Sequence, residues 1–290
     1  MTLHELLIAP FADFEFMRRA LVGAVALAIA SAPVGVMLML RRMSLTGDAM
    51  SHAILPGAAI GYLISGLSLT AMTLGGLVAG VVVAVSAGAV ARASRLGEDV
   101  SLAAFYLASL ALGVTIVSLK GSNVDLLHVL FGSVLALDDD ALVLIAGIAT
   151  MTLLAMAAIF RPLVIDSIDP TFLRAVGGRT GAATHLVFMG LVVLNLVGGF
   201  HALGTLMAVG LMMLPAAAAR LWVDDLTALV TTATAIGAVS AVAGLLASYH
   251  LGLPAGPAIV LTAGGVWFAS LIVGRRGLLA GRLGVRHLEA

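Results

Sequence analysis

An aspartate and a histidine lie four residues apart in "SLTGDAMSHAILPG", residues 44–57, between two strongly apolar stretches. In an α-helix such a pair shares one face, so the carboxylate of Asp48 and the imidazole of His52 can reach the same cation. If these stretches cross a membrane, the aspartate alone costs roughly 2.5–3.5 kcal/mol unless it is paired or hydrated. This cost favours a functional role, and the pair is a candidate metal site.

A second feature of the same stretch is the pair Pro56 and Gly57, one turn after His52. A helix broken there would free backbone carbonyls to line a cavity or help bind a cation. The structural alternative is that Asp48 merely caps a helix beginning near Met50, while His52 bonds to a backbone carbonyl. Both interpretations remain open at this point.

Other potential ligands are individually weaker. His201, in "GGFHALGTL", is either a further ligand or gate, or the partner in an interhelical hydrogen bond. Asp125 and His128 fit solvated residues at a membrane surface better than a first contact for substrate. Met212 and Met213 lie in the apolar "VGLMMLP", where methionine usually serves packing.

Composition defines the environment of these residues. Hydrophobic residues make up 61% of the chain, charged residues only 10%, and the mean hydropathy is +1.16. These values indicate an integral membrane protein, and we expect residues 1–290 to form a single transmembrane domain. The absence of cysteine excludes disulfides and thiolate ligands. The scattered arginines and zero net charge argue against a nucleic-acid partner.

Hydropathy predicts an all-α polytopic fold with roughly eight to ten transmembrane helices. The predicted spans are near 20–40, 50–66, 70–91, 101–119, 141–160, 184–200, 203–220, 226–248 and 256–274. With the N-terminus outside, twelve of the fifteen lysines and arginines lie on the cytoplasmic side, which obeys the positive-inside rule.

One connection on the predicted outer face is more than a turn. Residues 121–140, "GSNVDLLHVLFGSVLALDDD", contain an apolar stretch that is too short to span the membrane. We expect a short re-entrant or interfacial helix there, before the three aspartates.

A connection on the predicted inner face has the signals of a compact helix. Asp169 is a typical N-cap, Pro170 suits the first helical position, and Gly177 with Gly178 forms the stop. The apolar face would consist of Phe172, Leu173 and Val176. Such a helix fits insertion into a partner's groove, and the alternative is an ordinary surface helix lying on the bilayer.

Several motifs together resemble one known family. They are "FMRRALVG" at 16–23, "RRMSLTGDAMSHAILPGAAIGY" at 41–62, "GEDVSLAAFYLASLALGV" at 97–114, "DLLHVLFGSVLAL" at 125–137, "DPTFLRAVGG" at 169–178 and "GTLMAVGLMMLPAAAARL" at 204–221. With these motifs the chain resembles the ABC-3 family, the permeases of bacterial zinc, manganese and iron(II) uptake systems.

The resemblance implies a permease homodimer in the bacterial plasma membrane. Two cytoplasmic ATPase subunits would drive it, and an extracytoplasmic metal-binding protein would deliver the ion. The 169–178 helix then becomes the coupling helix that contacts the ATPase. Its coupling residues would be Asp169, Pro170, Phe172, Leu173, Arg174 and Gly177.

The chain itself lacks the motifs of an enzyme, since H-E-x-x-H, G-x-S-x-G and the phosphate-binding loop are all missing. We therefore expect no permanently bound cofactor, and a transported metal as the only ligand. Carboxylate and imidazole suit zinc, manganese and iron(II), and the affinity order with seven histidines favours zinc. Because transport requires release, a sparse set of Asp48 and His52, completed by carbonyls, water or His201, is reasonable.

The alternatives are a manganese or iron(II) importer of the same type and an ATPase-independent channel or secondary transporter. An intramembrane hydrolase is the weakest hypothesis, because Ser51 points about 100° away from His52 on a helix.

Overall fold

The computed structural model describes residues 3–66, 68–94, 96–119, 134–169, 172 and 180–279, and within these ranges the regular structure is entirely helical. The helices are α1 (Leu3–Leu7), α2 (Ala9–Asp13), α3 (Glu15–Leu40), α4 (Ser44–Ala53), α5 (Leu55–Ser65), α6 (Leu69–Ala93), α7 (Glu98–Leu119), the 3-10 helix η1 (Val134–Ala136), α9 (Asp139–Ile168), α11 (Thr180–Leu203), α12 (Thr205–Arg220), α13 (Leu226–Leu251) and α14 (Ala255–Val273).

Seven helices of the described chain are long and apolar enough to cross a membrane, namely α3, α6, α7, α9, α11, α13 and α14. The all-α polytopic prediction is therefore confirmed. The other two predicted spans correspond to shorter helices. The span predicted at 50–66 falls on α4 and α5, which are separated at Ile54, and the span at 203–220 matches the 16-residue α12.

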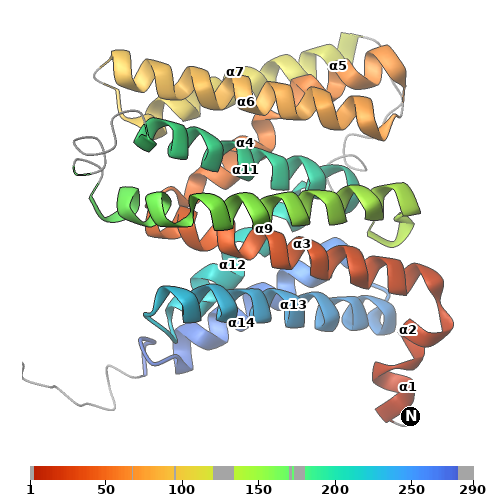
Figure 1. Cartoon of the computed structure of the whole chain (residues 1–290). Coiled ribbons are helices and arrows are strands. Elements are labelled where there is room, and N and C mark those ends of the chain that lie inside the picture. Colours follow the sequence, from red (N-terminus) through yellow and green to blue (C-terminus); the bar gives the residue numbers. More distant parts are fainter. Residues whose placement is uncertain are drawn as a thin grey trace, which may run out of the picture.

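The long helices lie side by side across the bundle (Figure 1). At the top of this view α5, α6 and α7 pack on one another, and α12, α13 and α14 form a second group at the bottom. Between them lie α3, α9 and α11, with α3 contacting α9, α11, α12 and α13. The short α4 contacts α6, α7, α11 and α12, so the candidate metal residues are placed inside this arrangement.

Side-chain caps fix where several helices begin. Asp138 accepts a hydrogen bond from the Ala141 amide at 2.8 Å, and Asp225 accepts one from the Ala228 amide at 2.9 Å. These bonds satisfy amides that have no partner in the first turn of a helix. Of the three aspartates predicted to end the outer connection, Asp138 is therefore a helix cap. The preceding residues 120–133, including Asp125 and His128, lie outside the described residues.

Ion pairs tie α3 to α9 at both ends of the bundle. At the end predicted to face outward, Arg19 lies 3.1 Å from Asp139. At the opposite end, Arg41 lies 2.6 Å from Asp166. The two helices therefore run parallel, since their N-terminal ends meet at one end of the bundle and their C-terminal ends meet at the other.

Glycines allow a close contact between α5 and α6 near the candidate site. A Cβ added at Gly57 of α5 would lie 1.9 Å from the carbonyl oxygen of Gly75 in α6, and one at Gly75 would lie 2.1 Å from that of Gly57. Only glycine permits this backbone approach, which replaces the hydrophobic driving force that lipid does not provide.

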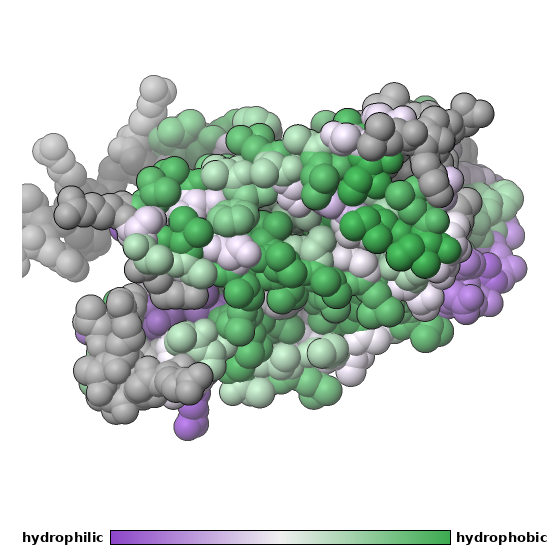
Figure 2. Space-filling view, turned by 90° about the horizontal axis from the view of Figure 1, so that it is seen from above, coloured by the Kyte–Doolittle hydropathy of each residue, from purple (hydrophilic) through white to green (hydrophobic). Residues whose placement is uncertain are grey.

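The flank of the bundle is predominantly apolar, and hydrophilic residues gather toward its ends (Figure 2). Large apolar side chains such as Val78, Leu154 and Leu261 are more than 60% exposed. In water such a surface would be a liability for aggregation, whereas in a bilayer it contacts the acyl chains.

Candidate metal site

Helix α4 begins at Ser44, and Met43 occupies the N-cap position. Asp48 therefore lies in the helix interior, and the alternative in which it caps a helix starting near Met50 is wrong. The reason is the preceding turn, which closes α3 by hydrogen bonds from the Arg42 amide to the Met39 carbonyl and from the Met43 amide to the Leu38 carbonyl. This tight closure lets the next helix begin at once.

Asp48 and His52 face each other as their spacing predicts. The Nε2 atom of His52 lies 3.8 Å from Oδ1 of Asp48, and the two side chains are 29% and 64% exposed. Nδ1 of His52 is buried and has no hydrogen-bond partner among the described residues, so the carbonyl-bonded alternative is not observed. The arrangement leaves a carboxylate and one imidazole nitrogen open on the same face of α4.

The helix break predicted at Pro56 is present and lies at Ile54, between α4 and α5. Proline has no N–H to donate to the carbonyl four residues earlier, which is that of His52. The His52 carbonyl instead accepts from the Ile54 amide. The next carbonyl, that of Ala53, accepts a 2.9 Å hydrogen bond from the hydroxyl of Ser109 in α7. The break is therefore supported by a neighbouring helix directly beside the candidate ligand.

The surroundings hold the His52 ring. The ring of Tyr106 in α7 stacks on it with 6.3 Å between centroids and 29° between planes. Elsewhere on α4, the fully buried Met212 approaches Gly47, and its Cε lies 2.7 Å from the position that a Cβ of Gly47 would occupy. Met212 thus packs against α4, as predicted.

Tyr106 and Ser109 were not identified from the sequence. Both come from a separate helix, and nothing in their spacing relates them to residues 48–52. A hydroxyl within an apolar span was the single available signal for Ser109.

The described side chains supply no complete metal cage. No group of three or more His, Cys, Asp or Glu residues that could hold a metal occurs among them. His201 lies in the last turn of α11, and its side chain is outside the described part of the structure, so its role remains a prediction. Two ligands on one exposed face can bind a divalent cation whose other positions are taken by water, carbonyls or another chain.

The predicted inner helix is described only at its start. The Phe172 amide donates a 3.0 Å hydrogen bond to Oδ1 of Asp169, which is the geometry of the predicted N-cap. Phe172 is 53% exposed, as a docking residue requires. The remaining predicted coupling residues, Pro170, Leu173, Arg174 and Gly177, lie outside the described residues.

The helical bundle and its apolar flank define a multi-pass membrane protein. The family model of the ABC 3 transport family matches residues 13–274. The chain belongs to this family.

Individual relatives agree along most of their length. The chain is 34% identical to the manganese transport system membrane protein MntC of Listeria monocytogenes, covering 92% of this chain and 94% of that protein. It is 32% identical to the manganese import system permease protein ScaB of Streptococcus parasanguinis, covering 90% and 91%. Among solved structures, PsaBC from Streptococcus pneumoniae in complex with Fab matches with a TM-score of 0.84 and 30% identity, covering 98% of this chain and 100% of that chain.

Membership of the family confirms three sequence predictions. The chain is a permease subunit, it resides in the bacterial plasma membrane as a multi-pass protein, and it is not itself an enzyme.

Proposed function

We propose that this chain is the permease subunit of an ABC importer for a divalent transition metal, with manganese as the favoured ion. The observation that carries the proposal is the Asp48–His52 pair, placed on one face of α4 next to a helix break in a member of a transport family. Both residues act as ligands, and neither performs covalent chemistry.

We favour manganese over zinc as the transported ion, although the affinity order and the histidine count of the sequence favoured zinc. Both relatives compared above carry manganese in their names. Selectivity in cells follows geometry, ligand type and metal availability rather than intrinsic affinity. A site with one carboxylate, one imidazole and open positions for water or carbonyl oxygens suits a hard ion such as manganese, and this supports manganese over zinc.

A sparse site also suits transport. Asp48 is 64% exposed within the single chain, so its carboxylate is accessible to a second copy of the chain or to water. We infer that a permease homodimer encloses the pathway and that the ion is never bound by a closed cage, which would retain it.

The source of energy is a pair of separate ATPase subunits. Support comes from the capped segment that begins at Asp169, with Phe172 exposed on it. An extracytoplasmic metal-binding protein would deliver the ion at the opposite face of the membrane.

The test is uptake of radioactive manganese into proteoliposomes that contain the permease, its ATPase and the binding protein. Asp48→Ala and His52→Ala should each lower metal affinity at least about 100-fold, because even outer-shell partners of metal ligands contribute about 10- to 100-fold. Asp140→Ala removes an exposed aspartate from the first turn of α9 and serves as the matched control, with uptake expected near that of the parent. Normal uptake by both site variants would remove the pair from the transport pathway.

Two further arms of the same experiment separate the alternatives. Uptake that proceeds equally well without the ATPase would favour a channel or secondary transporter. Competition by unlabelled zinc at lower concentration than by unlabelled manganese would restore zinc as the favoured ion.

A further inference from the structure

A buried charged cluster joins three helices at the end of the bundle where α3 and α9 finish. Nη2 of Arg41 donates to Oδ2 of Asp166 at 2.6 Å and lies 3.2 Å from Nδ1 of His185. The Arg41 and Asp166 side chains are only 10% and 11% exposed. Because a guanidinium can only donate, Nδ1 of His185 is the acceptor and its ring proton is on Nε2.

An aromatic ring completes the cluster. The guanidinium of Arg41 lies 5.4 Å from the centroid of the Phe188 ring in α11, within the range of a cation–π interaction. Arg41 is therefore held by α9 through a charge and by α11 through both an imidazole and a ring. We call the set Arg41, Asp166, His185 and Phe188 the arginine cluster.

Arg41 is rigidly connected to the helix that carries the candidate metal ligands. It is the C-cap of α3, and the next residue, Arg42, has φ of 58°, a left-handed conformation that non-glycine residues seldom adopt. The closure of this turn places the start of α4 at Ser44, so Asp48 follows within the first turns of the same short helix. A displacement of Arg41 should therefore move the start of α4 as well, because only a tight turn separates them.

The partners of Arg41 flank the inner connection on both sides. Asp166 is in the last turn of α9, three residues before the cap Asp169, and His185 is in the second turn of α11. A movement of the segment between these helices would therefore displace the helix ends that carry Asp166 and His185, the two residues that contact Arg41.

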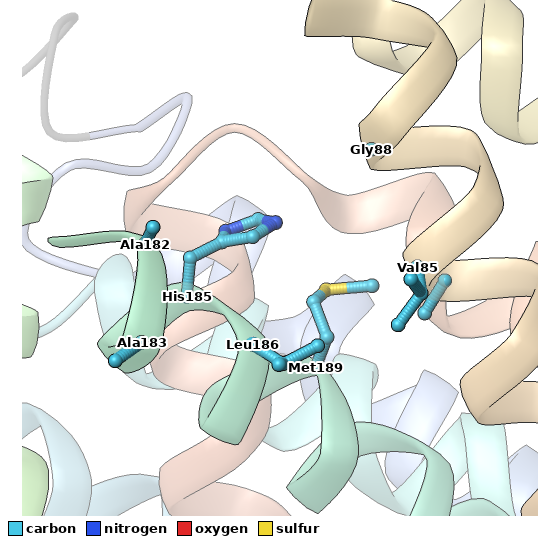
Figure 3. A pocket seen from close by; sticks show the side chains of 8 residues that line it. Val85, Gly88, Ala182, Ala183, His185, Leu186 and Met189 are labelled. Carbon is cyan, nitrogen blue, oxygen red and sulfur yellow. The ribbon is translucent and has the colours of Figure 1, made fainter. Parts of the chain in front are cut away.

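A hollow lies beside the cluster between α6 and α11. It has a volume of about 320 Å³, and the imidazole of His185 and the thioether of Met189 project into it from α11, opposite Val85 and Gly88 of α6 (Figure 3). A second metal site is disfavoured here, because the imidazole of His185 already accepts a hydrogen bond from the guanidinium of Arg41. The hollow leaves room for the first turns of α11 to move relative to α6.

We propose that Arg41 is a positioning residue that transmits movement of the inner connection to α4, and so to Asp48 and His52. The inference rests on the proposed function as an ATPase-driven permease. When the ends of α9 and α11 shift, Asp166 and His185 carry Arg41 with them, and the tight turn after α3 reorients α4. Burial makes this link stiff, because separating the charges would leave an ion unpaired in a low-dielectric region.

The decisive variant replaces the charged pair by apolar residues, Arg41→Met together with Asp166→Leu. Removing both charges preserves folding better than removing one. The matched control is Arg19→Met together with Asp139→Leu, which removes the other Arg–Asp pair between the same two helices, at the far end. Reconstituted complexes are compared for manganese binding, basal ATP hydrolysis and the number of ions transported per ATP.

We expect the Arg41/Asp166 variant to bind manganese within about twofold of the parent, a difference no larger than the usual non-additivity between distant sites. Its ions transported per ATP should fall about tenfold, inside the range of 5- to 150-fold that coupling between sites typically spans. The Arg19/Asp139 control should retain the parental ratio. Arg41→Lys keeps a cation opposite Asp166 and should restore part of the ratio.

Two results would overturn the inference. One is a parental transport ratio in the Arg41/Asp166 variant, and the other is a loss of manganese binding as large as the loss of transport, which would mean that the cluster only maintains the site. If the double variant does not fold, His185→Phe keeps a ring in place while removing the acceptor. A parental ratio in that variant overturns the inference equally.

Failure of the proposed function gives a different result. In that case the unmodified complex shows no ATP-dependent manganese uptake. Failure of the present inference appears only when the unmodified complex transports manganese and the cluster variants match it.

Discussion

The close contact between Gly57 and Gly75 gives a quantitative prediction for Gly57→Ala. The added Cβ would lie 1.9 Å from the Gly75 carbonyl oxygen, whereas ordinary contact begins at 3.4 Å. Helices α5 and α6 must therefore separate by about 1.5 Å or distort, and the obstacle is backbone, which cannot rotate away. Overpacking of this kind costs about 1–3 kcal/mol, and we expect the upper end of that range.

The same displacement should reach the candidate site, because α5 begins at Leu55, two residues after α4 ends beside His52. Disturbed support of a metal ligand typically lowers metal affinity by about 10- to 100-fold. The assay combines thermal unfolding of the purified permease with manganese binding. At roughly 2 °C per kcal/mol for a chain of this size, the unfolding midpoint should fall by about 6 °C.

Gly264→Ala in α14 is the matched control. A Cβ at Gly264 meets no atom within 4 Å, so this change should be neutral or stabilise the helix by up to about 1 kcal/mol. Equal midpoints for the two variants would refute the packing argument. A lowered midpoint with unchanged manganese binding would refute the link from α5 to His52 while leaving the packing argument intact.

Three further predictions concern the site and the coupling helix. Ser109→Ala should destabilise the protein by about 1–3 kcal/mol in thermal unfolding, because the Ala53 carbonyl loses its donor. The control Ser118→Ala removes an exposed hydroxyl and should change stability by no more than about 0.5 kcal/mol. His52→Asn keeps a polar side chain but removes the imidazole, so manganese binding to the purified permease should weaken, and parental binding would exclude His52 as a ligand. Phe172→Asp should leave manganese binding nearly normal while transport and metal-stimulated ATP hydrolysis fall, and full transport would rule out the assignment of 169–178 as the coupling helix.

The membrane class, the all-helical fold and the central pair could be predicted from the chain alone, whereas two of the nine predicted spans proved to be shorter helices. Long apolar runs can be satisfied in a bilayer only by helices, so composition and length nearly determine the secondary structure. The i, i+4 spacing of Asp48 and His52 is a local property of one helix, and it needs no tertiary information. The break at Pro56 is equally local, since the missing N–H acts four residues earlier in the same chain. The hydrogen bond from the Phe172 amide to Asp169 is local too, since the two residues are three apart in the chain.

Tertiary packing decided the features that depend on several helices at once. Ser109 bonds to a carbonyl 56 residues earlier in the chain, and Tyr106 stacks on a ring 54 residues earlier. Arg41 pairs with an aspartate 125 residues later. None of these separations forms a recognisable pattern in the sequence. Most lipid-facing and buried positions have similar hydropathy, so the sequence pattern does not tell which face of a span meets another helix. Only folding determines which arginine becomes buried between the ends of α9 and α11.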